Sequence, residues 1–273
     1  MGLLFVVCGL IACCGGCANP TAPSSSVAHV LLRDDFNGTA LDSQTWEIPA
    51  GVGTFLGRTQ LRPPSESIRV ADGVLRLRID SYNPTAIKPG DSFWGSEIVS
   101  RQMFARGTGL VFLARVRLVD PVPGMVASLF AYRSGMGTRD EIDFEMLTND
   151  VAFNRVLTNL FRNEGFTSAG DPRNVIAPGF LATDFNELEF EWRPEVVRWK
   201  INGRVVREES MNIPGDPMTL RLNFWVPSTD FASAYDARLH PESTPIENHS
   251  FFYEVDSVEV RALPMNIRSL TAH

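Results

Sequence analysis

Three acidic residues recur at every second position in one short stretch of the chain: Glu141, Asp143 and Glu145. Apolar Ile142 and Phe144 stand between them, and this alternation is the period of a strand, whose successive side chains point to opposite faces. We therefore predict a strand with one apolar face and one face that carries three carboxylates. Neighbouring like charges repel and cost stability. A catalytic role would explain why the chain carries three such carboxylates despite this cost. The alternative to a catalytic strand is an exposed strand with an acidic face, or one that binds a cation.

Such a row of acids suits the hydrolysis of glycosidic bonds. In a strand the Cα atoms of Glu141 and Glu145 are roughly 13 Å apart. Two side chains that lean toward each other can approach the carboxyl separation of a retaining glycosidase, about 5–5.5 Å. Asp143 between them would couple to both, so that one glutamate is ionised as the nucleophile and the other is protonated as the general acid.

The sequence resembles glycoside hydrolase family 16, which includes lichenases, laminarinases and xyloglucan transglycosylases. Six motifs within residues 30–262 carry the resemblance: 34–38 (DDFNG), 72–77 (DGVLRL), 95–98 (GSEI), 140–145 (DEIDFE), 223–225 (NFW) and 253–256 (YEVD). The resemblance implies an all-β catalytic domain, a two-sheet β-sandwich of the concanavalin A-like jelly-roll type with a concave substrate cleft. It also implies that Glu141 is the nucleophile, that Glu145 is the acid and base, and that Asp143 holds Glu141.

Further residues match positions that bind the sugar in this family. Glu97 belongs to the Gly-Glu motif, while Asn159 and Phe161 match substrate-contacting positions, with Phe161 in place of the more common tyrosine. Asn223 and Trp225 alternate with apolar residues and match two more such positions. A tryptophan ring can stack on a pyranose while a nearby amide binds its hydroxyls. The alternative for Trp225 is a rim residue that packs under a loop.

Two departures from the family pattern put the identity of the sugar in doubt. The family often carries an arginine where this chain has Val99, and Arg101 on the same predicted face is the expected substitute. Arg139 stands where an aromatic residue often precedes the catalytic strand. Trp94 is a candidate replacement platform.

Members of the family often hold a structural calcium ion on the convex side. The matching positions are Asp35, the Gly73 carbonyl and Asp256, and oxygen ligands suit this hard cation. Asp256 also fits an ordinary surface aspartate. We expect no cofactor in catalysis, and the four histidines show no metal-binding spacing.

Composition limits the other classes of function. The 273 residues contain no linker after residue 30 and can form one core, which we expect in a monomer. The net charge of −7 argues against nucleic acid or an anionic membrane surface as the partner. No phosphate loop, dinucleotide fingerprint or nucleophile elbow occurs. The expected partner is a polysaccharide.

The four cysteines all stand among the first 17 residues: Cys8, Cys13, Cys14 and Cys17. Residues 3–14 are apolar but short for a membrane span, and they resemble the core of an export signal. Residues 10–13 (LIAC) look like a bacterial lipobox, which predicts lipid on Cys13, with Cys17 as the second candidate. No Lys or Arg precedes Arg33, so the usual positive segment is missing. An ordinary secretory signal is the alternative.

We therefore divide the chain into an export signal (1–17), a flexible tether (18–29), the catalytic domain (30–263) and a C-terminal tail (264–273). The protein is expected to be exported and lipid-anchored, facing the periplasm or the cell surface, or otherwise secreted.

Short runs of β-branched and aromatic residues between turn residues predict the strands of this domain. They span residues 30–36, 74–80, 95–103, 109–118, 125–133, 141–147, 156–162, 186–193, 196–201, 204–209, 218–226 and 251–262. Asn202-Gly203 predicts a two-residue hairpin turn. No amphipathic helix is predicted.

The uninterrupted acidic motif resembles the lichenase and xyloglucan branch of the family rather than the laminarinases. We therefore expect a retaining, endo-acting hydrolase of a mixed-linkage or β-1,4-containing β-glucan. A transglycosylase would differ only in whether water or a sugar completes the reaction. A non-catalytic carbohydrate-binding lipoprotein and a structural envelope protein are the alternatives from other classes.

Overall fold

The computed structural model describes residues 29–49, 55–61, 67–215 and 217–264. The predicted export signal, both candidate lipidation sites (Cys13 and Cys17), nearly all of the tether and residues 265–273 of the tail lie outside the described residues. No helix in the described part of the chain is long and apolar enough to cross a membrane.

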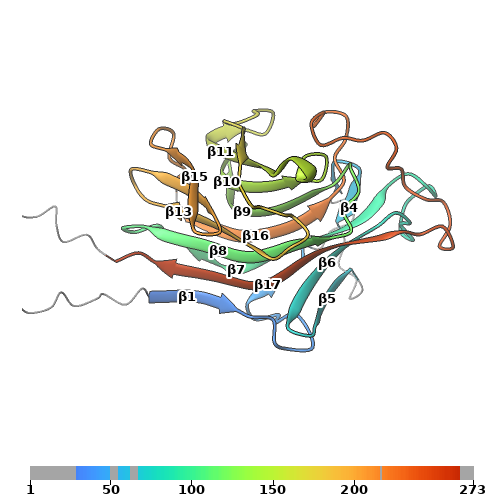
Figure 1. The fold of residues 1–273 in the computed structure, drawn as a ribbon, viewed down its shortest axis with the longest axis horizontal. Helices are drawn as coiled ribbons and strands as arrows, with labels where there is room; N and C mark the ends of the chain where they lie inside the picture. The colour runs from blue at the N-terminus through green and yellow to red at the C-terminus, as the bar shows by residue number, and fades with distance from the viewer. Residues whose placement is uncertain (1–28, 50–54, 62–66, 216, 265–273) are drawn as a thin grey trace, which may run out of the picture.

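The described residues form an all-β structure, and the predicted fold class is confirmed (Figure 1). The strands are β1 (His29–Asp34), β2 (Trp46–Glu47), β3 (Phe55–Leu56), β4 (Thr59–Leu61), β5 (Ile68–Ala71), β6 (Val74–Asp80), β7 (Phe93–Phe104), β8 (Leu110–Val119), β9 (Val126–Gly135), β10 (Thr138–Leu147), β11 (Arg155–Gly165), β12 (Arg173–Ile176), β13 (Asn186–Trp192), β14 (Val197–Ile201), β15 (Arg204–Glu209), β16 (Met218–Trp225) and β17 (Ser250–Ala262). A 3₁₀ turn (Val151–Phe153) precedes β11.

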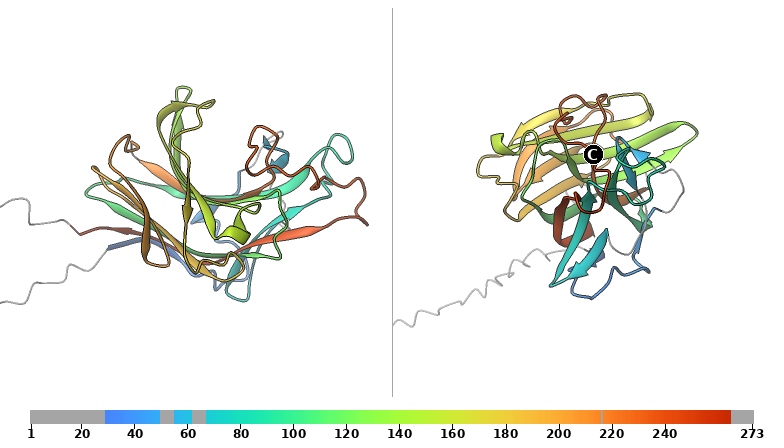
Figure 2. Two further views of the ribbon diagram at one scale, coloured as in Figure 1. Left: turned by 45° about the horizontal axis from the view of Figure 1, so that its top comes forward. Right: turned by 90° about the vertical axis from the view of Figure 1, so that its right-hand side faces the viewer.

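Two antiparallel layers pack face to face. One runs in the order β15-β14-β13-β8-β17, and β17 continues to β6 and β5 along one part of its edge and to β1 along another. The other layer runs β12-β11-β10-β9-β16-β7-β2. The long strand β7 also pairs with β4 and β6, so it joins the layers at one side. Figure 2 shows the two curved layers from two further directions.

The core lies between the layers because every long strand gives it one apolar face. On β13 the core-facing side chains Leu188, Phe190 and Trp192 are at most 1% exposed. The acidic residues that alternate with them, including Glu189 and Glu191, face outward and form ion pairs with Lys200. The hairpin predicted at residues 202–203 joins β14 to β15, and both of its residues have positive φ, as the turn requires.

Candidate active site

The catalytic candidates lie on β10, in the middle of the second layer. Ile142 and Phe144 point into the core and are fully buried. Glu141, Asp143 and Glu145 point to the opposite face, away from the first layer, as the alternation requires. Apolar burial of every second residue therefore fixes which way the three carboxyl groups point.

The first layer supports this strand from beneath. The indole nitrogen of Trp199, on β14, donates a hydrogen bond to the Asp143 carbonyl over 2.9 Å. Trp199 is fully buried, and the guanidinium of Arg207 lies 4.5 Å from its ring centroid. The centre of the acidic row is thus tied to the core rather than to a surface loop.

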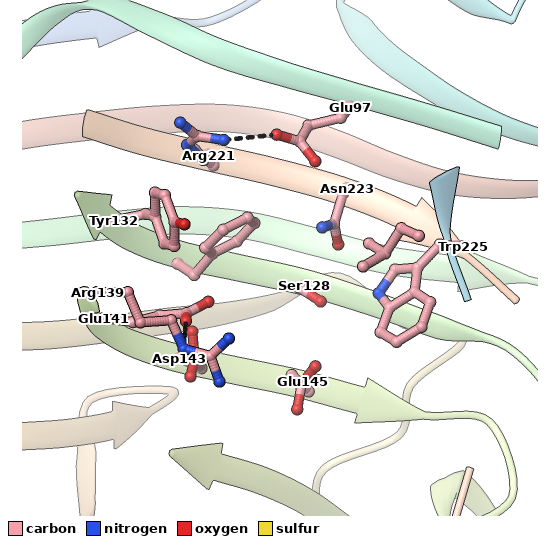
Figure 3. A pocket seen from close by; sticks show the side chains of 12 residues that line it. Glu97, Ser128, Tyr132, Arg139, Glu141, Asp143, Glu145, Arg221, Asn223 and Trp225 are labelled. Carbon is pink, nitrogen blue, oxygen red and sulfur yellow. Dashed lines mark hydrogen bonds and ion pairs between the residues drawn. The ribbon is translucent and has the colours of Figure 1, made fainter. Parts of the chain in front are cut away.

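The three carboxyl groups line a cleft of about 240 Å³ on the outer face of the second layer (Figure 3). Strands β7, β9, β10 and β16 and the short β3 supply its walls. Its lining residues are Leu56, Glu97, Ser128, Phe130, Tyr132, Arg139, Glu141, Asp143, Glu145, Arg221, Asn223 and Trp225.

Burial and mutual repulsion separate the protonation states of the three acids. Burial raises the pKa of Glu141 to about 6, although Arg139 and a hydrogen bond from Asp143 act in the opposite direction. Burial, with the neighbouring Glu141 and Glu145 charges, raises the pKa of Asp143 well above its usual range. Burial and the charge of Glu141 raise the pKa of Glu145 to about 8. Near pH 7 Glu141 is therefore ionised and Glu145 holds a proton, while the raised pKa of Asp143 favours its protonated form.

Register places a row of polar groups across the cleft floor at the level of Glu145. Glu145 is opposite Ser128, Ser128 is opposite Asn223, and Asn223 is opposite Glu97. The Ser128 hydroxyl and the Asn223 amide oxygen are buried and have no hydrogen-bond partner among the described residues. Buried polar groups in proteins are nearly always paired, so these two are suited to bind hydroxyl groups of a ligand.

Arg221, on β16, places a guanidinium in the wall of the cleft across from the acids of β10. It lies 3.0 Å from the Glu97 carboxylate and 4.5 Å from the ring centroid of Tyr132. Burial raises the pKa of Glu97, and Arg221 acts against that rise. The sequence interpretation missed Arg221, Tyr132 and Ser128; their alternation with buried residues placed them on the cleft face, but only strand register brings them next to the acids.

Trp225 lies at the edge of the cleft and is packed under a neighbouring loop. Its side chain lines the cleft. It also packs beside Phe231, with ring centroids 6.1 Å apart, and is 9% exposed. Trp94 is also buried, but it does not line this cleft.

Three predicted sugar-binding residues do not line the cleft. Asn159 and Phe161 lie on β11, opposite Asp143 and Glu141 respectively, but both are buried, and the Asn159 amide donates to the Ala169 carbonyl. Arg101 is about half exposed, donates to the Ser43 carbonyl and pairs with Glu47. The guanidinium expected from Arg101 is supplied in the cleft by Arg221.

The described residues do not fit the predicted calcium site. Both carboxylate oxygens of Asp35 accept hydrogen bonds from Arg33, at 3.0 and 2.9 Å. Asp256 pairs with Arg115 over 2.9 Å, and Gly73 lies in a turn beside Asn37. In the part of the chain that the structure describes, no three His, Cys, Asp or Glu side chains gather in a way that could hold a metal. Arginines satisfy the two carboxylates instead.

Comparison with known families identifies the chain. Residues 63–238 match the model of "Glycosyl hydrolases family 16". The chain belongs to this family. It is therefore a glycosidase, and the acidic row on β10 is its candidate catalytic centre.

Relatives of this family 16 enzyme include two bacterial proteins. A "Beta-glucanase" of Brevibacillus brevis is 29% identical over 191 residues, which are 68% of either chain. The "Endo-1,3-1,4-beta-glycanase ExoK" of Rhizobium meliloti is 26% identical over 198 residues, 71% of this chain and 68% of the relative.

Solved structures agree with the fold. A "prokaryotic beta-1,3-1,4-glucanase (lichenase)" from a mouse hindgut metagenome superposes with a TM-score of 0.65 and 25% identity, over 85% of this chain and 98% of that one. The Bacillus licheniformis β-glucanase superposes with a TM-score of 0.64 at 19% identity, over 85% and 98% of the two chains.

Proposed function

We propose that this enzyme is an endo-acting β-glucanase that cleaves its substrate by double displacement with retention of anomeric configuration. The observation that carries the proposal is the pair of same-strand glutamates whose pKa values differ, about 6 for Glu141 and about 8 for Glu145, in an open cleft. Retention needs one ionised and one protonated carboxyl group at neutral pH.

In the first step the Glu141 carboxylate attacks the anomeric carbon while Glu145 donates its proton to the departing glycosidic oxygen. A glycosyl ester on Glu141 forms, and the C–O bond to the leaving sugar breaks. In the second step Glu145, now ionised, takes a proton from water, and the water oxygen displaces Glu141 from the anomeric carbon. Asp143, whose pKa is raised by burial and by the neighbouring glutamates, shares a hydrogen bond with Glu141 that orients the nucleophile.

The substrate class follows from the cleft and from the relatives. The cleft is open rather than enclosed, as binding within a chain requires, and the relatives described above are called β-glucanases or β-glycanases, two of them with β-1,3-1,4 specificity. We therefore propose a mixed-linkage or β-1,4-containing glucan as the substrate.

A glycan-panel digest tests the proposal. Barley β-glucan, laminarin, carboxymethylcellulose and xyloglucan are incubated with the enzyme, and products are followed by chromatography and by ¹H NMR of the fresh anomers. We expect β-configured oligosaccharides from the mixed-linkage glucan. An initial α-product, or no new reducing ends on any β-glucan, would contradict the proposal. An added oligosaccharide acceptor that diverts the products into longer chains would reveal transglycosylation.

The activity should depend on pH as a bell-shaped curve. The enzyme is active when Glu141 has lost its proton and Glu145 has kept its own, so kcat/KM should fall below about pH 6 and above about pH 8. Each limb should lose about tenfold per pH unit. Initial rates at low substrate concentration between pH 4 and 10 measure both limbs, and a plateau that extends to pH 4 would contradict these protonation states.

Trp225 is expected to act in binding. Replacing Trp225 with alanine should raise KM about 5- to 30-fold, because loss of sugar stacking removes about 1–2 kcal/mol. The variant Trp225→Phe keeps an aromatic face and should lose much less. Initial rates on the glucan give KM, and an unchanged KM in a folded Trp225→Ala protein would leave Trp225 only a packing role.

We also propose that the enzyme is exported and that lipid on Cys13, or alternatively on Cys17, anchors it. The sequence supports this through a short apolar segment and through cysteines that occur nowhere else in the chain. Metabolic labelling with a radioactive fatty acid tests it: Cys13→Ser should remove the label, while a label that persists in the double Cys13→Ser, Cys17→Ser variant would refute it.

A further inference from the structure

Arg139 holds a cation directly against the proposed nucleophile. It precedes Glu141 by two positions on β10, so both side chains lie on the cleft face. Its Nε atom is 3.1 Å from a carboxylate oxygen of Glu141, and only 19% of its side chain is exposed. A charge pair this close and this shielded interacts much more strongly than one in open water.

Two further contacts fix the guanidinium. Its carbon atom lies 3.9 Å from the ring centroid of Phe161, the residue opposite Glu141 on β11. Its Nη2 donates to the Ser168 carbonyl over 3.2 Å. The aromatic face, the carbonyl and the Glu141 carboxylate therefore hold the arginine from three sides.

The loop that supplies the Ser168 carbonyl is itself closely packed on β11. The hydroxyl of Ser168 donates to Glu164 and accepts a hydrogen bond from the Gly170 amide. Gly170 has φ of +68°, and a Cβ placed there would lie 2.6 Å from the Phe161 ring and 2.7 Å from the Leu160 carbonyl. Only glycine fits this approach, so the loop packs directly against the Phe161 ring.

We propose that Arg139 is a positioning residue for Glu141, and that Phe161 and the loop at residues 165–171 hold it in place. The proposal rests on the assignment of Glu141 as nucleophile. On β10 the order is Arg139, Glu141, Glu145, and the leaving sugar lies on the Glu145 side. Arg139 therefore borders the glycone, where its guanidinium offers hydrogen-bond donors to sugar hydroxyls in place of a stacking ring.

Several groups besides Arg139 act on the protonation of Glu141. They are Asp143, which shares its strand and a hydrogen bond with it, and the charges of Arg221 on β16 and Glu97 on β7. Glu145, on the same strand, and Tyr132, opposite Glu141 on β9, lie nearby. Burial, the largest effect, raises the pKa of Glu141, and Arg139 is the largest of the groups that lower it. Arg139 also lowers the pKa of Glu145, against the effects of burial and of Glu141.

The variants Arg139→Met and Arg139→Lys test the positioning role through the pH profile. In Arg139→Met the acid limb should move upward from about pH 6 and the alkaline limb should move in the same direction, with kcat reduced about tenfold or more. Arg139→Lys keeps the charge and should keep both limbs close to those of wild type, while kcat still falls because an ammonium cannot reproduce the contacts of the planar guanidinium with the Phe161 ring and the Ser168 carbonyl. A purely structural role would change the melting temperature and leave the limbs in place.

A second measurement does not depend on turnover. Carboxyl ¹³C NMR of glutamate-labelled protein, with Glu141→Gln to assign the signal, should show the Glu141 titration at higher pH in Arg139→Met than in wild type. If wild type cleaves no glycan but this shift occurs, the proposed function fails and the pairing stands.

Gly170→Ala reaches Arg139 indirectly, since its Cβ must displace Phe161 or the loop. This variant keeps Arg139, and it should move the acid limb of the pH–activity profile in the same direction as Arg139→Met but by a smaller amount. A folded Arg139→Met protein with the kcat, limbs and Glu141 titration of wild type would overturn the proposal.

Discussion

Replacing Glu141 with glutamine is expected to lower kcat by about ten-thousand-fold or more while the protein stays folded. The amide cannot attack the anomeric carbon, so no glycosyl ester forms, and loss of a covalent nucleophile is among the most damaging changes to an enzyme. The fold should not suffer, because glutamine has nearly the same shape and removes one of the crowded charges that burial disfavours. The melting temperature at pH 8 should therefore equal or exceed that of wild type.

The measurement is the rate of release of reducing ends from the glucan, with circular dichroism as the check on folding. Glu187→Gln is the matched control, because Glu187 lies in the other acidic alternation, on β13, where it is exposed on the outer face. Its activity should equal that of wild type. A folded Glu141→Gln protein with full turnover would show that another group is the nucleophile.

A variant with a smaller side chain at position 141 distinguishes a catalytic nucleophile from a residue that only binds the substrate. Glu141→Ala leaves space in the cleft that azide can enter, and the anion can attack the anomeric carbon of an activated aryl glycoside from the face that Glu141 used. One displacement instead of two gives a glycosyl azide of inverted, α configuration. If azide restores no activity, or gives the β-azide, the assignment of Glu141 is wrong.

Most of the fold could be predicted because alternating apolar residues report the core face directly. The strands expected at residues 74–80 and 204–209 have those bounds in the structure, and the others differ by a few residues. The strands that were missed, β2, β3, β4, β5 and β12, have two to four residues each. So short a segment shows too little alternation to distinguish it from a loop. For β2 and β4, moreover, the partner β7 is distant in sequence.

The candidate site was only partly predictable, for reasons of register. The acids of β10 and the Asn223 and Trp225 side chains of β16 follow from alternation within one strand. Alternation also places Arg221 on that face of β16, but Tyr132, and the nearness of both residues to the acids, depend on β9 lying between β10 and β16 in a particular register, which no local pattern reveals.

Two further predictions, the sugar-binding residues on β11 and the calcium ligands, depended on contacts that alternation within a strand does not show. Asn159 and Phe161 have the predicted alternation, yet the loop at residues 165–171 folds over them because Gly170 permits a close approach. The carboxylates of Asp35 and Asp256 were expected to bind calcium, but arginines from nearby positions pair with them. In both cases the residue type was compatible with the expected role, and packing or pairing with other residues, which the motif does not show, gave the side chain other contacts.

Replacing Glu145 with glutamine should have the second-largest effect, and one that depends on the leaving group. A polysaccharide has a poor leaving group that must be protonated as the bond breaks, so kcat should fall by about a hundred- to ten-thousand-fold. An aryl glycoside with an acidic phenol needs little protonation, so formation of the glycosyl ester should be much less affected. Rapid phenol release followed by slow turnover would show this, because the amide also cannot deprotonate water in the second step. Equal losses of phenol release and polysaccharide cleavage would contradict the role of Glu145 as acid.

The same substitution should change how stability depends on pH. Because the pKa of Glu145 is about 8 in the folded protein and 4.5 for an unperturbed glutamate, the folded state holds a proton that the unfolded state releases. The contribution of this proton to stability is complete below about pH 4.5 and is lost as the pH rises through 8. Glutamine carries no such proton, so the melting temperature of Glu145→Gln relative to wild type should rise between pH 5 and pH 8, by roughly 5 °C or more. Thermal unfolding followed by circular dichroism at both pH values measures the difference. If it stays constant, Glu145 is ionised in the folded enzyme at neutral pH and cannot serve as the proton donor.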